Sequence, residues 1–206
     1  IILTFKLPLL FIVKRTVFQQ FCAGSNLEES METVNKLFSK NVYSYLSYSV
    51  EGAQNNDSFK KSCQDVIDSI EFASDKKNIP FTVFKPTAIS KTDNLMRGEI
   101  DKITFDRFDR ICKKASEKNV KILIDAEESW IQDSIDSIAL MMMKKYNKQK
   151  TIVFNTVQMY RHDRLEYLKD LHNSSKQNDF EIGIKLVRGA YIEKENIRAK
   201  KLNYKS

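Results

Sequence analysis

Charged and amide side chains follow several apolar runs of this sequence, each close to the point where the run ends. Lys85, Asp125 and Gln158 follow three successive runs, and Lys185 and Arg188 lie within and just after the next one. Ammonium, guanidinium, carboxylate and amide groups together can bind an anionic substrate and stabilise charge that develops during a reaction. The pattern therefore predicts one polar site that is assembled from several separate segments.

The apolar runs have the composition of strands in a parallel sheet. Such strands are covered on both faces and read as nearly continuous apolar runs, whereas the helices between them repeat their apolar residues about every 3.6 positions. A (β/α)8 barrel has about 31 residues per βα unit, and the spacing of these runs fits that value. A doubly wound sheet fits it as well, but no glycine-rich turn follows the first run, which weakens a dinucleotide-binding interpretation. We expect strands at 42–50, 81–84, 121–124, 151–154 and 182–187, and helices at 58–77, 103–118, 130–146 and 165–176.

The carboxyl ends of parallel strands meet at one rim, which is where active sites form in such folds. Burying Lys185 and Arg188 without an anionic partner would be costly, so the pattern predicts a bound anion or carboxylate at the mouth. A carboxylate after a strand can also be an ordinary helix cap, and a lone lysine there is often only a surface residue. The residues expected to converge at the rim are Ser47, Glu51, Lys85, Asp125, Gln158, Lys185 and Arg188, with the cap alternative left open for Glu127, Glu128 and Ser129.

The composition excludes several classes of protein. The 206 residues carry a net charge of +7, but lysines alternate with acidic residues and no basic run is interleaved with aromatics, so we expect no nucleic-acid partner. The odd number and wide spacing of Cys22, Cys63 and Cys112 predict neither a disulfide framework nor a zinc site, and indicate a reducing compartment. His162 and His172 lack a metal-binding context, so no metal is expected.

The first residues differ in character from the rest of the chain. Residues 1–13 are apolar but contain Lys6 and Pro8, and they are too few for a membrane span, which takes about 20 residues. We expect residues 1–40 to form an N-terminal helical segment that packs on the protein or touches a membrane, and residues 41–206 to form the barrel.

Several segments resemble one known family in order and spacing. These are residues 124–128 (Ile-Asp-Ala-Glu-Glu), 155–160 (Asn-Thr-Val-Gln-Met-Tyr) and 183–191 (Gly-Ile-Lys-Leu-Val-Arg-Gly-Ala-Tyr), with weaker matches at 83–88 and 48–52. From about Phe18 onward the chain resembles the proline dehydrogenases, and Lys-Leu-Val-Arg-Gly-Ala-Tyr is the most specific part of the resemblance.

The resemblance implies a distorted (β/α)8 barrel that holds FAD, of which this chain supplies about the first five βα units. It implies oxidation of L-proline to Δ1-pyrroline-5-carboxylate by hydride transfer to flavin N5, and transfer of the electrons to a membrane quinone. Peripheral membrane association follows, in the bacterial cytoplasm at the inner membrane or at the mitochondrial inner membrane.

The resemblance also assigns roles to individual residues. Cations suit both an anionic substrate and a reduced, anionic flavin. For the substrate, the resemblance implies that Lys85 holds the proline carboxylate and that Asp125 orients the substrate beside the flavin. For the flavin, it implies that Gln158 hydrogen-bonds the ring and that Lys185 occupies a position often filled by an arginine near N5, with Arg188 as the next cation. Gly189, Ala190 and Tyr191 would line the pocket, and Glu51 matches a carboxylate that pairs with a gating arginine.

Two departures from the family pattern limit this interpretation. Ser47 stands where an aspartate is common, and the family's C-terminal Tyr-x-x-Arg-Arg helix does not occur in the sequence, so we expect an incomplete, inactive fragment. Two alternatives remain: a Schiff-base aldolase or lyase that uses Lys85 or Lys185 as its nucleophile, and a barrel fragment that binds a ligand without catalysis.

Overall fold

The computed structural model describes residues 26–47 and 55–205, together with positions 16, 18, 20 and 22–24. The chain divides into two compact units, residues 1–44 and 45–206. The first unit contains helix α3 (Leu27–Phe38), which begins at Asn26 because the Asn26 side chain accepts a hydrogen bond from the Glu29 backbone N–H at 2.8 Å. Within the described residues, no helix is both long and apolar enough to cross a membrane.

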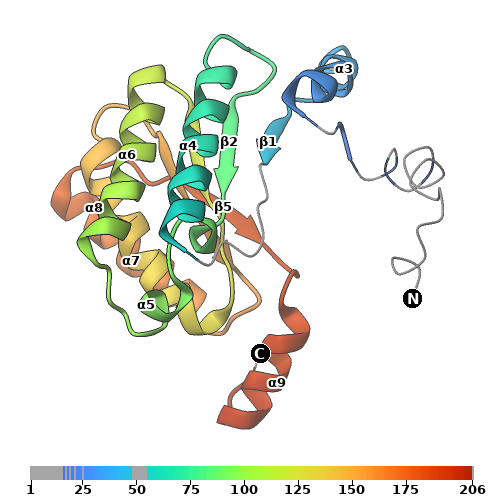
Figure 1. Cartoon of the computed structure of the whole chain (residues 1–206). Coiled ribbons are helices and arrows are strands. Elements are labelled where there is room, and N and C mark those ends of the chain that lie inside the picture. The colour runs from blue at the N-terminus through green and yellow to red at the C-terminus, as the bar shows by residue number, and fades with distance from the viewer. Residues whose placement is uncertain are drawn as a thin grey trace. The chain divides into compact units, whose positions relative to one another are not determined.

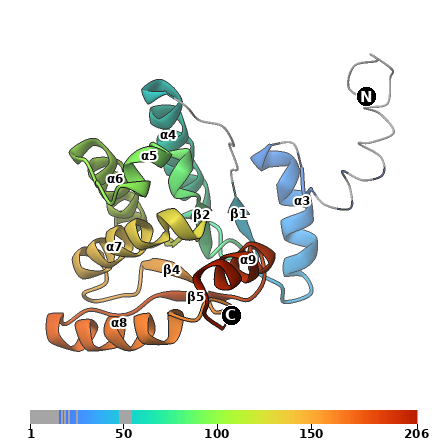
Figure 2. The same ribbon diagram turned by 90° about the horizontal axis from the view of Figure 1, so that it is seen from below.

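The second unit is built on a parallel sheet in which each strand pairs with its neighbour in sequence (Figure 1). The connecting helices α4, α6, α7 and α8 lie on the outer face of the sheet (Figure 2). The predicted α/β architecture with a five-stranded parallel sheet is therefore confirmed. Its strands are β1 (Tyr45–Ser47), β2 (Phe81–Phe84), β3 (Lys121–Ile124), β4 (Val153–Gln158) and β5 (Ile184–Val187), and its helices are α4 (Asn56–Ala73), η2 (Pro86–Ala88), α5 (Thr92–Met96), α6 (Lys102–Lys118), α7 (Ser129–Tyr146), α8 (Arg164–Asn178) and α9 (Ile192–Leu202).

Most predicted elements agree with the structure within two or three residues, but the strands differ at their starts. The strand expected at 42–50 is described only over Tyr45–Ser47, with 42–44 outside it, and β5 begins at Ile184 rather than at 182. The strand expected at 151–154 begins at Val153 and continues to Gln158, because the polar residues that were placed beyond it remain hydrogen-bonded to β5. Helix α4 ends at Ala73, earlier than expected, and the short helices η2 and α5 were not expected. The predicted residues 48–52, including Glu51, lie outside the described part of the chain.

The two faces of the sheet have different interiors. On the outer face Phe84 packs edge-on against Phe108 of α6, with ring centroids 5.4 Å apart, and both are almost fully buried. On the inner face Phe81 and Phe154 contact each other edge-on at 5.3 Å, and the Lys121 ammonium lies over the Phe81 ring. Alternate residues of each strand thus fill two apolar layers. The inner layer is the floor below the carboxyl ends of the strands.

Two residues fix the amino ends of β4 and β5. The fully buried side chain of Asn147, at the end of α7, accepts hydrogen bonds from the N–H groups of Ile152 and Val153 and donates to the carbonyls of Val153 and Glu181. Gly183 must be glycine, because a Cβ there would lie 2.3 Å from the Val153 carbonyl oxygen. Both contacts set the register of β5 against β4.

Substitution of Asn147 by alanine should strongly destabilise the sheet. Four backbone groups would lose their partner, three of them in buried hydrogen bonds, and we expect the free energy of unfolding to fall by about 3 kcal/mol. Urea unfolding followed by circular dichroism measures this. The control is Asn178→Ala, which removes only an exposed hydrogen bond to Ser174. Equal effects of the two substitutions would contradict the role given to Asn147.

Candidate active site

The parallel register places four polar side chains in one row above the apolar floor. Thr156 of β4 is paired with Lys185 of β5, and Asp125 follows directly on the pair of Ile124 with Asn155. The Asp125 N–H donates to the Phe84 carbonyl at 3.0 Å, which extends the β2–β3 ladder by one residue. Because in-register residues of neighbouring strands point to the same face, the row runs Lys85, Asp125, Thr156, Lys185 on the inner face.

An ion pair crosses this row. The Lys185 ammonium lies 2.8 Å from Asp125 Oδ1, and both side chains are about three-quarters buried, with 25% and 28% exposed. The pair bridges β3 and β5 over the intervening strand β4. The cation that was expected to need an anionic partner therefore has one within the protein, and it holds the Asp125 carboxylate at the centre of the row.

A buried carboxylate connects the turn after Lys85 to this centre. The Glu127 side chain, 7% exposed, accepts two hydrogen bonds from Thr87, from the backbone N–H at 2.9 Å and from the hydroxyl at 2.6 Å. Burial raises the pKa of Glu127, although the two Thr87 hydrogen bonds oppose the shift. The helix-cap alternative does not describe Glu127, because the N-cap of α7 is Glu128, whose side chain makes no capping bond.

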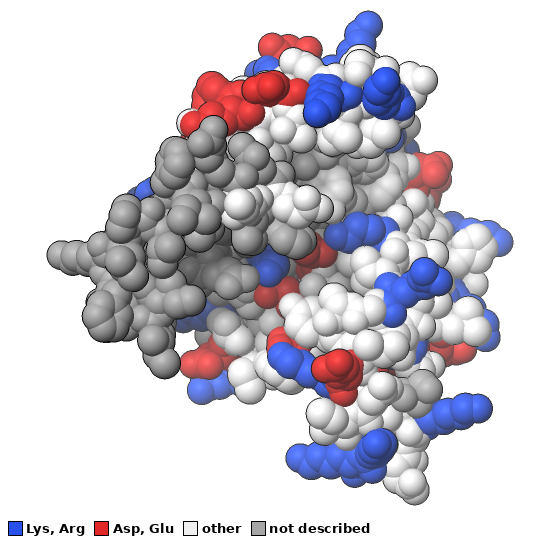
Figure 3. Space-filling view, turned by 90° about the vertical axis from the view of Figure 1, so that its right-hand side faces the viewer, with Lys and Arg blue, Asp and Glu red and all other residues white. Residues whose placement is uncertain are grey.

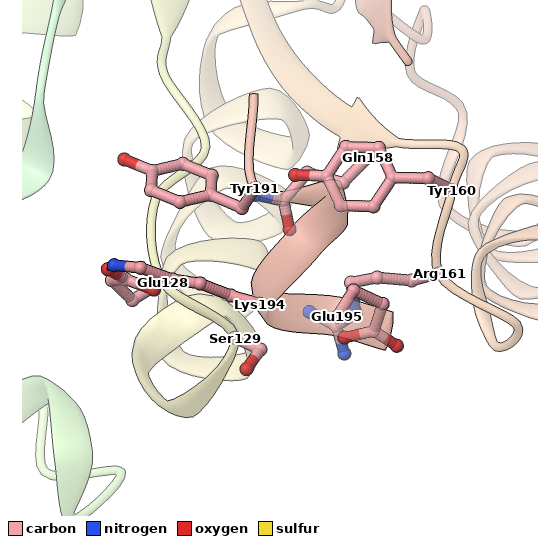
Figure 4. A pocket seen from close by; sticks show the side chains of 8 residues that line it. All are labelled: Glu128, Ser129, Gln158, Tyr160, Arg161, Tyr191, Lys194 and Glu195. Carbon is pink, nitrogen blue, oxygen red and sulfur yellow. The ribbon is translucent and has the colours of Figure 1, made fainter. Parts of the chain in front are cut away.

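Gln158 is fixed by the same segment and leaves one acceptor unused. Its Nε2 donates to the Glu127 carbonyl at 2.7 Å, and the side chain is almost fully buried. Gln158 Oε1 has no hydrogen-bond partner within the described structure. Buried polar atoms are nearly always paired, so this oxygen is suited to an N–H or O–H donor of a bound group. Figure 4 shows Gln158 beside Tyr191 in a small pocket.

The remaining predicted residues are placed less centrally. Tyr191, at the start of α9, is half-buried; burial raises its pKa, and the positive charge of Lys85 opposes the shift. Arg188, Gly189 and Ala190 are exposed. Arg188 directly follows β5, and the alternation of side chains along the strand points it to the outer face. The structure does not bring Arg188 to the row, and the roles predicted for these residues stay predictions.

A polar network behind the row was not expected from the sequence. Asp136 of α7 accepts hydrogen bonds from Gln132 and Asn155 at 2.8 Å each, and from Arg164 of α8 at 2.5 Å. Gln132 also accepts the Glu127 N–H at 3.0 Å. The network ties the outer face of β4 and two helices to the loop that carries Glu127. The one signal in the sequence is Asn155, a polar residue inside a strand.

The surroundings of the row carry charges of both signs. On the face shown in Figure 3, Lys and Arg lie among Asp and Glu over much of the described surface, and basic side chains gather at the lower end, over α9, whose last turn contains Lys200 and Lys201. Within the described ranges, no three His, Cys, Asp or Glu residues are grouped as metal ligands would be.

A cation, a carboxylate and an amide at the carboxyl ends of parallel strands define the class: an α/β protein with an enzyme-type rim site. The chain belongs to the proline dehydrogenase family, whose model matches residues 30–206.

Individual relatives agree with this assignment. The chain is 29% identical over 187 residues to the carbapenem antibiotics biosynthesis protein CarD of Pectobacterium carotovorum, with 85% of the chain and 50% of that protein covered. It is 27% identical to mitochondrial proline dehydrogenase 1 of Dictyostelium discoideum, with 95% and 43% covered. The chain thus spans about half the length of these relatives.

Solved structures show the same fold. Proline utilization A from Bdellovibrio bacteriovorus superposes with a TM-score of 0.80 at 16% identity, over 94% of this chain and 22% of that one. Proline utilization A from Corynebacterium freiburgense gives a TM-score of 0.73 at 13% identity over the same shares of the two chains.

The raised pKa of Glu127 predicts a specific pH dependence of stability. Between the usual pKa of a glutamic acid, about 4.3, and the raised pKa in the folded state, the unfolded chain loses its proton first, so ionisation favours unfolding. The free energy of unfolding of the wild type, measured relative to Glu127→Gln, should therefore fall as pH rises through this range. Glu166→Gln, at an exposed position, is the matched control. A difference between wild type and Glu127→Gln that is constant with pH would contradict this account.

Proposed function

We propose that this chain belongs to an enzyme that oxidises L-proline to Δ1-pyrroline-5-carboxylate with FAD as the hydride acceptor. The observation that carries the proposal is the Asp125–Lys185 ion pair in one row with Lys85, in a chain of the proline dehydrogenase family. A cation suits the substrate carboxylate, and a carboxylate suits the substrate ammonium.

Residues in and beside the row fit a flavin. Gln158 Oε1 is a buried acceptor without a partner in the described structure, and a ring N–H of the isoalloxazine is a donor of the required kind. The flavin, when bound, supplies a two-electron acceptor at its ring. We assign Gln158 and Lys185 to holding its ring, and Arg188, Gly189 and Ala190 to the segment beside it.

The chain's own residues would bind and orient the substrate. Lys85 binds the proline carboxylate, and Asp125, fixed by Lys185, lies next to Lys85 in the row. Tyr191 covers the side that faces α9, and Glu51 is proposed to pair with an arginine that gates the site. The apolar inner layer below the row excludes water from the reacting carbon, which strengthens each of these electrostatic contacts.

The same proposal covers the rest of the protein. We propose that the five βα units form part of a (β/α)8 barrel, with residues 1–40 as an N-terminal segment. The electrons pass to a quinone, with peripheral association at the bacterial inner membrane or the mitochondrial inner membrane. Relatives named mitochondrial proline dehydrogenases in Dictyostelium discoideum and Arabidopsis thaliana support the second location.

One alternative loses support from the geometry. A Schiff-base enzyme needs an uncharged amine as its nucleophile, whereas Lys185 is ion-paired with Asp125, so within this alternative Lys85 is left as the candidate nucleophile. Borohydride in the presence of a carbonyl substrate would trap such a lysine covalently, and no trapping is expected. The binding fragment without catalysis remains the other outcome, and the following experiment separates it from the enzyme.

The first experiment is the visible absorption spectrum of the protein extended to the end of its coding region, before and after anaerobic L-proline. We expect a flavin spectrum that bleaches on addition of proline. A flavin that ignores proline but responds to trans-4-hydroxyproline would move the substrate to another cyclic amino acid. A protein without flavin would contradict the proposal. The 206-residue chain alone should not bleach.

In the extended protein, Asp125→Ala should lower proline turnover on the order of a hundredfold while the fold is retained. The loss arises because Lys185 loses its partner and the substrate ammonium loses its anion. Steady-state kinetics and thermal unfolding measure the two effects. Asp106→Ala, at an exposed position of α6, is the control and should behave as the wild type. Unchanged kinetics in Asp125→Ala would remove this residue from the site.

A further inference from the structure

A small pocket lies between the end of β4 and the first turn of α9, next to the row but outside it (Figure 4). Arg161 and Glu195 line it from opposite elements, Arg161 from the β4–α8 turn and Glu195 from α9. Its volume is about 10 Å³, which is close to the space that one water molecule needs.

Arg161 is a buried cation whose guanidinium group is only partly hydrogen-bonded. The residue is 4% exposed, and its Nη2 donates to Asp163 at 2.7 Å. Its Nε and Nη1 are buried without a hydrogen-bond partner in the part of the chain that the structure describes. A buried guanidinium with unmet donors is costly, so these two groups require an acceptor in the pocket.

Glu195 presents the matching acceptor on the other wall. It is 3% exposed, its Oε1 accepts from the Tyr204 hydroxyl at 2.7 Å, and its Oε2 accepts from Arg198 at 3.4 Å, which leaves further lone pairs of the carboxylate for the pocket. The Tyr204 ring in turn stacks on His162, the residue after Arg161, with centroids 3.9 Å apart. Helix α9 is therefore already held against the β4–α8 turn at one place, and the Arg161–Glu195 pair lies beside it.

We propose that Arg161 and Glu195 are positioning residues, bridged by one water in the pocket, that hold the first turn of α9 against the end of β4 and thereby set the position of Tyr191 in the substrate site. Neither residue touches the row itself. The part that concerns substrate rests on the proposed function, whereas the bridge between the two elements does not.

Backbone hydrogen bonds connect the pair to the site on both sides. The Glu195 N–H donates to the Tyr191 carbonyl at 2.9 Å, and the Arg161 N–H donates to the Gln158 carbonyl at 3.0 Å. A change in the distance between Arg161 and Glu195 must therefore move the turn of Tyr191 relative to the turn of Gln158. These turns carry the proposed substrate and flavin contacts, so the pair sets the width of the space between them.

Hydrogen exchange in the 206-residue chain tests the bridge without any activity. In Glu195→Gln and in Arg161→Met, the amides of 192–202 should exchange on the order of tenfold faster, because a buried charged hydrogen bond is lost. Glu193→Gln and Arg97→Met, the same substitutions at exposed positions, should leave that exchange unchanged. Amides of α6 report whether each variant is folded.

The double variant makes the test sharper. If both residues serve one bridge, Arg161→Met combined with Glu195→Gln should exchange no faster than the faster of the two single variants. Additive effects, or wild-type exchange in either single variant, would overturn the proposal. Should Arg161→Met fail to fold, Glu195→Gln is compared with Arg198→Met, which removes the Arg198–Glu195 ion pair but not the bridge; faster exchange in Glu195→Gln than in Arg198→Met supports the bridge, and equal exchange overturns it.

A kinetic measurement in the extended protein then tests the link to substrate. Glu195→Gln should raise the KM for L-proline about tenfold, with kcat within about twofold, because Tyr191 is displaced while the row is intact. Equal losses in KM and kcat, or none, would overturn the positioning role. If the wild type itself does not oxidise proline, the proposed function fails, and hydrogen exchange still decides whether the bridge exists.

Discussion

The register of the parallel strands is the constraint on which the rest of the structure depends. Asp125 directly follows Ile124, so the register places it between Lys85 of one neighbouring strand and Thr156 of the other. Thr156 is in turn paired with Lys185. A slip of one residue in any strand would turn its polar residue to the helix-covered face. Asn147 and Gly183 lie at the opposite ends of these strands, yet they act on the site because they fix that register.

A second requirement, the pairing of buried polar groups, shapes the loops above the strands. Glu127 uses its carboxylate for Thr87, its N–H for Gln132 and its carbonyl for Gln158. The turns after β2 and β3 and the end of β4 are thus fixed around one residue, and the only buried acceptor left over on Gln158 faces the site. Among the described residues, Thr156 Oγ1 in the row is another buried oxygen without a partner, so unused polar groups lie at the site itself.

The sequence predicts the elements of this fold better than the contacts between them. Apolar runs located β2 and β3, and the motif of residues 183–191 indicated the family, because both signals are local. The convergence of Lys85, Asp125 and Lys185 followed from the rule that parallel strands end at one rim. Three features depend on contacts between distant segments, which no local pattern reports. They are the Asp136 network, the hydrogen bonds of Asn147 and the Arg161–Glu195 pocket.

The Lys185 ion pair also explains how the rim tolerates a departure from the family pattern. An arginine, common at this position in the family, has a forked group that can bind two partners at once, whereas a lysine offers one compact charge. Here that charge is committed to Asp125. The next cation, Arg188, is exposed and not engaged in the row. The proposed flavin site therefore relies on a lysine whose single charge is committed to the carboxylate, and Arg188, which lies outside the row, adds no second cation there.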